Sequence, residues 1–435
     1  MSIYTDKKLS LEAFLELEED GVYYTGHASI IVRVSGSNFL FDYVKDNAPY
    51  GDRWVFFPEL VKDIPMDRID GIFVSHVHQD HFDPVFLKGA EIRCPVYVIG
   101  GRPSFEVALK RNGIRSIEIP PGEKFLLAPG VYVWGFLHQS NGVDASCCIG
   151  NANFSVYHGN DNYLNNELLG SIDPEFSSID VACIPYAYIN WYPQLLENLT
   201  AAERADESRR LCHLYFEYAI EQAEKLNARQ VIPFGANLVY KDDARSALNL
   251  ECKTPLDFER YVRDTRGEAA ALRFKALFSG DLIVKRNQAL EVHSANRFDA
   301  DAYRGQMQEF LETLGDRTIP SGAVGTTAPG VGMSRIRTVT TPTSYDHFIC
   351  VRLEGREEGV MVNTRDSRVM PYDRDYLESN ELHHHIVTIK DPGIYFGWLA
   401  GDLTMEEIIG TRRFSISRQP NIYNKDVLFI ATTQL

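Results

Sequence analysis

Short apolar runs separated by turn residues dominate the first part of the chain and predict a strand-rich fold. Ile30–Val34 and Phe39–Phe41 flank turn residues 36–38, which is the pattern of a β-hairpin. Ile72–Val74 is a further short apolar run, typical of a buried strand. The same pattern predicts strands at Val96–Ile99, Val131–Trp134, Phe154–Tyr157, Val181–Ile184 and Gln230–Phe234.

Helix-start signals occur at two places between these strands. Asp83 precedes Pro84, which is typical of a helix N-terminus because Asp caps free N–H groups and proline fits the first turn. Residues 200–227 give the clearest helical pattern, with Thr200 and Glu203 at capping-box spacing. Early strands followed by a strand–helix–strand unit indicate a layered α/β fold.

The composition changes after residue 314. Residues 315–335 are rich in Gly and Pro, which favours a linker over a phosphate-binding loop, since such a loop needs a strand before it and a helix after it. Phe348–Val351 and Val360–Val362 are strand-like, and Thr404 and Glu407 have capping-box spacing. We therefore expect a main domain over residues 1–314, a Gly/Pro-rich linker or loop over 315–335, and a smaller α+β module over 336–435.

Composition and charge limit the classes of function. Of the 435 residues, 44% are hydrophobic and 24% charged, as in a globular protein with a sizeable core. The net charge of −16 argues against binding to nucleic acid or an anionic membrane, because both need clustered Lys and Arg. An anionic small substrate stays compatible, since a local pocket can oppose the global charge. The N-terminus lacks a signal-peptide core and the seven cysteines are dispersed, so we expect a cytoplasmic protein.

The strongest chemical signal directly follows Ile72–Val74. His76, His78, Asp80 and His81 place four candidate metal ligands at the end of this predicted strand. Alternate residues that leave a strand can converge on one cation, while the next turn directs Asp80 and His81 at a second position. These ligands suit zinc, iron or manganese, so they do not select one metal. A polar surface cluster is the alternative, but the preceding apolar strand favours a metal site.

With this motif the chain resembles the metallo-β-lactamase superfamily, which implies an αββα sandwich. The resemblance implies a third histidine at the end of a later strand, where His138 follows Val131–Leu137. It also implies a bridging carboxylate after a further strand, where Asp161 follows Phe154–Tyr157. The implied first metal takes His76, His78 and His138, and the second takes Asp80 and His81, with Asp161 between the two.

The last histidine of the superfamily has no counterpart at its usual place. It normally follows a strand that ends in an Ile-Pro-like segment, but Val231–Asn237 contains no histidine. The site is then either mononuclear or takes a ligand from elsewhere in the chain. His293 and His383–His385 are candidate donors, although three consecutive histidines are more often found at a surface or an interface.

Several segments resemble one branch of the superfamily, the metal domain of CMP-N-acetylneuraminate hydroxylase and its lactonase-like relatives. The resemblance covers about residues 20–265. That hydroxylase also carries a Rieske iron–sulfur centre, which takes two Cys and two His ligands. Cys212-His213 has no partner pair in this chain, so no Rieske module is expected. The similar segments are Gly26–Ser29, Phe39–Asp42, Ser75–His81, Leu137-His138 with Asp144, and Ile232–Gly235.

Three functions are compatible with these residues. A hydrolase would use a metal-bound hydroxide to attack an ester, lactone, amide or phosphodiester of a small molecule, with Asp80 or Asp161 as the catalytic carboxylate. A non-haem iron oxygenase with one or two irons would instead need a separate reductase as electron donor. A non-catalytic metal-binding scaffold is the third, and the number of ligands argues against it.

Three further residues are candidates for contact with the substrate or the ligands. His158 lies three positions before Asp161, and a structural role is equally compatible with it. Tyr188 and Trp191 belong to an aromatic-rich stretch after Val181–Ile184, where loops of this fold line the pocket. Packing beneath the C-terminal module is the alternative for both aromatic residues.

Overall fold

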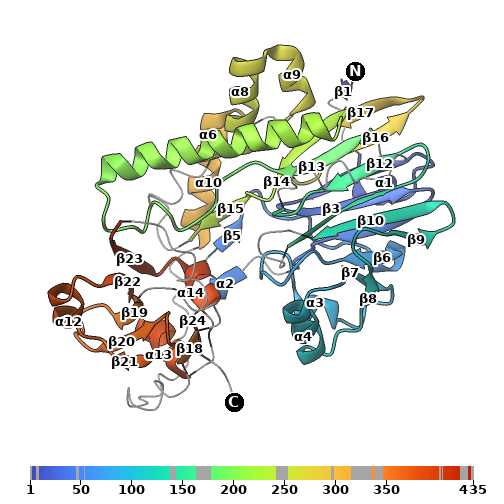
Figure 1. Ribbon diagram of the computed structural model, residues 1–435. Coiled ribbons are helices and arrows are strands. Elements are labelled where there is room, and N and C mark those ends of the chain that lie inside the picture. Colours follow the sequence, from blue (N-terminus) through green and yellow to red (C-terminus); the bar gives the residue numbers. More distant parts are fainter. Residues whose placement is uncertain are drawn as a thin grey trace. The chain divides into compact units, whose positions relative to one another are not determined.

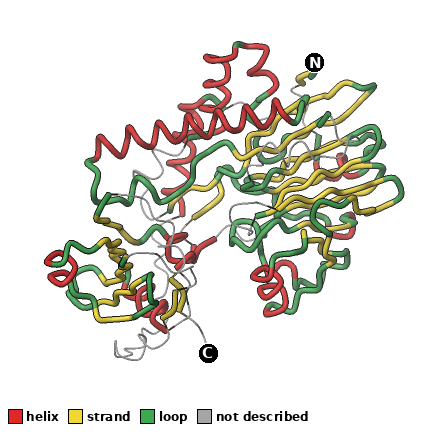
Figure 2. The backbone as a smooth tube through the Cα atoms, in the orientation of Figure 1, coloured by secondary structure: helices red, strands yellow, loops and turns green. Residues whose placement is uncertain are grey.

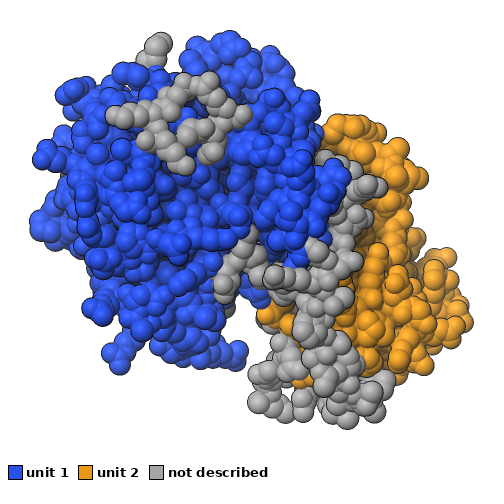
Figure 3. Space-filling model, turned by 180° about the vertical axis from the view of Figure 1, so that it is seen from behind, with its two compact units in different colours: residues 1–189, 211–315 blue, residues 190–210, 316–435 orange. Residues whose placement is uncertain are grey.

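The computed structural model divides the chain into two compact units (Figure 3). Unit 1 comprises residues 1–189 and 211–315, and unit 2 comprises residues 190–210 and 316–435. The structure describes residues 2–5, 9–45, 49–52, 54–137, 144–162, 178–241, 253–294, 298–314, 336–338, 346–400, 403, 405–421 and 430–432.

Unit 1 contains two large β-sheets, whose strands form two layers (Figures 1 and 2). The nine-stranded sheet has the order β1 (Ile3–Thr5), β17 (Ala289–His293), β16 (Leu282–Arg286), β2 (Gly21–Gly26), β3 (Ser29–Val34), β4 (Ser37–Phe41), β6 (Gly71–Phe73), β7 (Val96–Ile99) and β8 (Ile117–Ile119). The six-stranded sheet has the order β14 (Gln230–Phe234), β13 (Val181–Pro185), β12 (Ser155–His158), β11 (Ala145–Gly150), β10 (Val131–Leu137) and β9 (Lys124–Ala128). β5 (Trp54–Phe56) pairs with β15 (Leu238–Tyr240).

Helices cover the outer faces of both sheets, which gives the expected αββα sandwich. Strand β3 explains the layering, because Ile30 and Val32 face the core between the sheets, whereas Ile31 faces the helical layer. The nine-stranded sheet packs against α1 (Leu11–Leu15), α3 (Pro84–Leu87) and α4 (Pro103–Arg111), and the six-stranded sheet packs against α6 (Ala201–Lys225) and α8 (Pro255–Arg266). The other helices in the described part of unit 1 are α2 (Pro49–Asp52), η1 (Met66–Arg68), α9 (Glu268–Arg273) and α10 (Ala300–Leu314).

The structure confirms the hairpin and the two helix caps that the sequence predicted in unit 1 and α6. The predicted hairpin is β3–β4, with antiparallel pairing. The Asp83 side chain accepts hydrogen bonds from the N–H groups of Val85 and Phe86 at the start of α3. Thr200 and Glu203 form the expected capping box, with their reciprocal bonds at 2.8 and 3.3 Å. Among the described helices, none is long and apolar enough to cross a membrane.

Unit 2 is an α+β module, as expected. Trp191 and Leu196 lie buried in its core, so residues 190–210, which the sequence placed with the main domain, pack with the C-terminal strands. The predicted helix cap at Thr404 lies outside the described residues. The main sheet has the order β21 (Val369–Pro371), β20 (Gly359–Asn363), β19 (His347–Leu353), β22 (His383–Ile389) and β23 (Phe414–Gln419), and β18 (Ile336–Thr338) pairs with β24 (Ile430–Thr432). The helices are α12 (Arg374–Ser379), α13 (Pro392–Ala400) and α14 (Met405–Thr411).

A buried histidine pair makes the stability of unit 2 depend on pH. His347 Nε2 lies 2.8 Å from His385 Nδ1, and burial lowers the pKa of His347 to about 4 and that of His385 to about 3. Below the ordinary histidine pKa the unfolded chain therefore binds protons that the folded unit does not, and stability falls as the pH falls. We expect the melting temperature of unit 2 to drop between pH 6.5 and pH 4, and to drop less in a His347→Gln/His385→Gln variant. Equal slopes of melting temperature against pH would contradict this expectation.

Candidate metal centre

The candidate ligands come from the ends of strands in both sheets of unit 1. Asp42 follows β4, His76 follows β6, and Asp161 follows β12. Asp144 directly precedes β11, and His27 lies in the tight turn between β2 and β3. Because side chains at strand ends are held by rigid sheets, these residues converge without long flexible loops. Within the described residues, three groups of His and Asp bring their donor atoms within 4.8 Å of one another.

The first group consists of His76, His78 and Asp144. His76 Nε2 lies 2.5 Å from His78 Nδ1 and 3.5 Å from Asp144 Oδ1. Two imidazole nitrogens at this separation direct their lone pairs at the same point, and they repel each other unless a cation or a proton lies there. His76 and Asp144 are buried, so water does not satisfy them. The predicted third histidine, His138, lies outside the described residues.

The second group is centred on His81 and Asp161. Asp161 Oδ2 lies 3.5 Å from His81 Nε2 and 3.7 Å from His76 Nε2, so this one carboxylate oxygen lies near a nitrogen of both groups. His81 Nε2 is fully buried and has no hydrogen-bond partner among the described residues. The nearest charged groups to this nitrogen are the carboxylates of Asp161 and Asp80, each at 3.5 Å. A cation bound between the nitrogen and the carboxylates would satisfy all of them.

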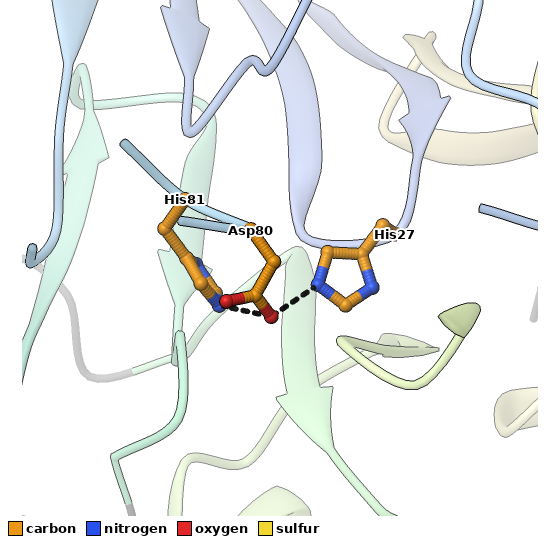
Figure 4. Close-up of side chains that lie close together, drawn as sticks. All are labelled: His27, Asp80 and His81. Carbon is orange, nitrogen blue, oxygen red and sulfur yellow. Dashed lines mark hydrogen bonds and ion pairs between the residues drawn. The ribbon is translucent and has the colours of Figure 1, made fainter. Parts of the chain in front are cut away.

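The third group joins His27 to Asp80 and His81 (Figure 4). Asp80 Oδ2 lies 3.1 Å from His27 Nε2 and 3.5 Å from His81 Nε2, so two imidazole rings face one carboxylate oxygen. The other oxygen, Oδ1, accepts a hydrogen bond of 3.2 Å from the Tyr50 hydroxyl. Asp80 is thereby fixed in orientation by groups on three separate segments of unit 1.

Asp42 and Ser75 contact the Nδ1 atoms of His81 and His76. Asp42 Oδ2 lies 3.0 Å from His81 Nδ1 and can accept its proton, which would leave Nε2 as the atom that binds a metal. The Ser75 hydroxyl donates to the same oxygen at 2.5 Å and lies 3.1 Å from His76 Nδ1. His76 Nδ1 also lies 3.1 Å from Asn160 Nδ2, so Ser75 and Asn160 together hold this ring with Nε2 facing His78 and Asp144.

The electrostatics of the site favour a divalent cation. Burial, then His78 and His81, lower the pKa of His76 well below its usual value, so its imidazole is neutral as a ligand must be. Burial raises the pKa of Asp161 to about 6, with His81 opposing and Asp144 reinforcing the rise. Burial also acts on Asp80, but His81 and His27 hold its pKa well below its usual value. Burial opposes charge on His81, but Asp161 and Asp80 hold its pKa well above its usual value, so this ring carries a proton that a bound cation would replace. The donor set fits one or two metal ions.

The other sequence-based candidates have different surroundings. His158 Nε2 lies 2.9 Å from the carbonyl oxygen of Ala28, behind the ligands, where its ring packs against Phe41 and Phe234. The structure places the Tyr188 ring against Tyr215 of α6, Trp191 in the core of unit 2, His293 on β17, and His383–His385 on β22.

Three functional candidates had no signal of their own in the sequence. His27, Asp42 and Asp144 fall in segments that carried the family resemblance, but no spacing rule marks them as ligands or as their supports. Their positions after β2, after β4 and before β11 put them at the site only when the sheets are assembled. A search for His and Asp residues at the ends of predicted strands could have identified all three.

The comparisons with known proteins concern the fold of unit 1. Residues 21–187 match the sequence model described as "Beta-lactamase superfamily domain". This match covers part of unit 1, whose two sheets between layers of helices have the expected αββα arrangement. The similar solved structures include metal-dependent hydrolases and a diiron hydroxylase. Among the curated proteins, none matches the chain.

Three solved structures illustrate the range of these neighbours. Igni18, a metallo hydrolase from Ignicoccus hospitalis, is 16% identical over 61% of this chain and 98% of its own, with a TM-score of 0.39. CmlA, a diiron β-hydroxylase from Streptomyces venezuelae, is 21% identical over 58% of this chain and 52% of its own, with a TM-score of 0.39. An isothiocyanate hydrolase from Delia radicum gut bacteria is 11% identical over 60% of this chain and 98% of its own, with a TM-score of 0.40.

Proposed function

We propose that the chain is a metal-dependent hydrolase that acts on an ester, lactone, amide or phosphodiester of a small molecule. The observation that carries this proposal is the position of Asp161 Oδ2 between His76 Nε2 and His81 Nε2, at 3.7 and 3.5 Å. A carboxylate shared by two groups of ligands is the arrangement of a two-metal hydrolytic site. Hydrolysis needs no electron donor, and the sequence offers no Rieske ligand set.

In such a hydrolase, Asp161 and Asp80 would have different roles beside the bound cations. Bound divalent cations would supply Lewis acidity and lower the pKa of water from ~15.7 toward ~7. Asp161 directs Oδ2 at the histidines, and its side chain is 38% exposed, so a water molecule can reach the carboxylate, which can orient it or accept its proton. Asp80, at 12% exposure, is held by His27 and Tyr50, so a ligand role suits it better than proton transfer.

A second candidate function is supported by the group His76, His78 and Asp144. Two histidines and one carboxylate on one face of a site are the ligand set of many non-haem iron oxygenases. In that case the metal would be iron, and a separate reductase would supply electrons. His81, Asp80 and Asp161 could hold a second iron as well as a second hydrolytic metal, so the number of ligands does not separate the two functions. We place the oxygenase second because it needs a separate reductase, which hydrolysis does not.

Metal analysis combined with a dioxygen-controlled screen separates the two functions. The protein would be purified anaerobically, its metals quantified, and turnover tested under nitrogen on p-nitrophenyl acetate, a γ-lactone and bis(p-nitrophenyl) phosphate. We expect turnover without dioxygen that a chelator abolishes and added zinc or manganese restores. Bound iron, with turnover that requires dioxygen and a reductant, would overturn the hydrolase in favour of the oxygenase. A protein that retains no metal would contradict both.

A further inference from the structure

The end of β14 reaches the metal centre without providing a ligand. In the resemblance described above, a histidine is expected just after this strand, but Gly235 follows Phe234 here. A Cβ atom placed on Gly235 would lie 3.8 Å from Asp161 Oδ1, so this position borders the ligands. The second group of ligands therefore lacks the side chain that the superfamily supplies from this strand.

His27 lies directly beside that position. The Gly235 N–H donates a 3.1 Å hydrogen bond to the His27 carbonyl, which ties the β2–β3 turn to the end of β14. The Tyr24 hydroxyl donates to the same carbonyl at 2.8 Å. His27 has a left-handed backbone with φ of +52°, a conformation that non-glycine residues rarely adopt and that the surrounding bonds maintain. Such strain is common where a side chain must be aimed at a functional site.

The imidazole of His27 points toward Asp80, a candidate ligand of the metal centre (Figure 4). The side chain is 2% exposed, and its Nε2 lies 3.1 Å from Asp80 Oδ2. Asp80 Oδ2 is in turn 3.5 Å from His81 Nε2. Ligands bound to one metal at about 2.0–2.2 Å lie roughly 3.0–3.5 Å from one another, and both distances to Asp80 Oδ2 fall in this range. All three donor atoms lie within 4.8 Å of one another.

We propose that His27 is a ligand of the second metal and replaces the histidine that is absent after β14. The inference rests on the metal centre of the proposed function and holds for a hydrolase or an oxygenase alike. Nε2 would bind the metal, and Nδ1 would carry the proton. The second metal position would then have His27, Asp80 and His81 as ligands, with Asp161 shared.

A hydrogen bond from His27 to Asp80 without metal binding is the competing role, and two variants separate the roles. His27→Gln keeps an N–H donor at about the reach of Nε2, but an amide is a poor ligand for these metals. His27→Asn keeps a residue that tolerates the left-handed backbone but cannot reach Asp80. His158→Gln is the matched control, because His158 is equally buried and bonds to a backbone carbonyl.

Metal binding is measured by chelator competition and by ¹H NMR of the cobalt-loaded protein, in which each coordinated imidazole N–H gives a shifted, exchangeable resonance. We expect both His27 variants to bind the first metal normally, to bind the second a hundredfold or more weakly, and to lose one such resonance. His158→Gln should keep both metals and every resonance.

Three other outcomes would contradict the role of His27, and they differ in what they imply for the proposed function. If His27→Gln retains the second metal and all resonances, His27 only positions Asp80, and the hydrolase proposal stands. If the wild-type protein binds a single metal, the inference about His27 is wrong and the hydrolase would be mononuclear. If the wild-type protein binds none, the proposed function fails together with the inference.

Discussion

Asp161→Asn is expected to lower hydrolytic turnover about a thousandfold while the first metal stays bound. Asp161 Oδ2 is the oxygen near both His76 Nε2 and His81 Nε2, so its loss removes the negative charge shared by the two groups of ligands. An amide keeps the shape of the carboxylate but binds cations weakly and accepts no proton. Metal content and kcat/KM on the best substrate of the screen measure the two effects separately.

The control for this variant is Asp63→Asn, because Asp63 lies in an exposed loop away from the ligands and also has a left-handed backbone that Asn tolerates. Its metal content and turnover should equal those of the wild type. Asp161→Asn with full turnover and two bound metals would show that Asp161 is not shared between metals, and the proposed two-metal hydrolysis would lose its main support.

The parts of the fold that the sequence predicted are those set by local patterns. The apolar run in Ile30–Val34 predicted β3, and capping signals at Asp83 and Thr200 predicted α3 and α6, because each depends on side chains within a few positions. The packing of Trp191 and Leu196 with unit 2 was not predictable in this way. It depends on strands about 150 residues further along the chain, and an aromatic-rich segment alone does not indicate which sheet it packs against.

The same distinction applies to the metal centre. His76, His78, Asp80 and His81 were recognisable because they follow one strand at a characteristic spacing. His27 is separated from Asp80 by 53 positions and contacts it only because β2, β3 and β6 belong to one sheet. A single histidine in a hairpin turn has no pattern that distinguishes it from a structural residue.

Asp42 lies at the end of β4 and contacts the histidine motif that follows β6. It is fully buried and lies within hydrogen-bond distance of three donors, the Ser75 N–H at 2.7 Å, the Ser75 hydroxyl at 2.5 Å and His81 Nδ1 at 3.0 Å. Burial acts to raise its pKa, but His81 and Ser75 hold the pKa below its usual value, so the carboxylate is ionised. Stability and metal binding should therefore both depend on this residue.

Asp42→Ala is expected to lower the free energy of unfolding of unit 1 by about 3–5 kcal/mol, because three buried donors lose their acceptor at once. Metal affinity should also fall about 10–100-fold, since His81 loses the group that fixes its proton on Nδ1. Urea unfolding of the metal-free protein and chelator competition measure these effects. Ser75→Ala, which removes the hydroxyl bond and leaves the other two, should cost only about 1 kcal/mol.

Asp42→Asn separates the two roles of the carboxylate. Asparagine tolerates the left-handed backbone at this position, where φ is +43°, and its amide oxygen can still accept the Ser75 N–H. Its amide nitrogen, however, faces the Nδ1 proton of His81 as a second donor and pushes that proton toward Nε2, the atom that must bind the metal. We therefore expect Asp42→Asn to lose metal affinity nearly as strongly as Asp42→Ala while losing much less stability. If instead it binds metal as tightly as the wild type, Asp42 does not control the tautomer of His81, and Nε2 of His81 is not held in place as a ligand by this contact.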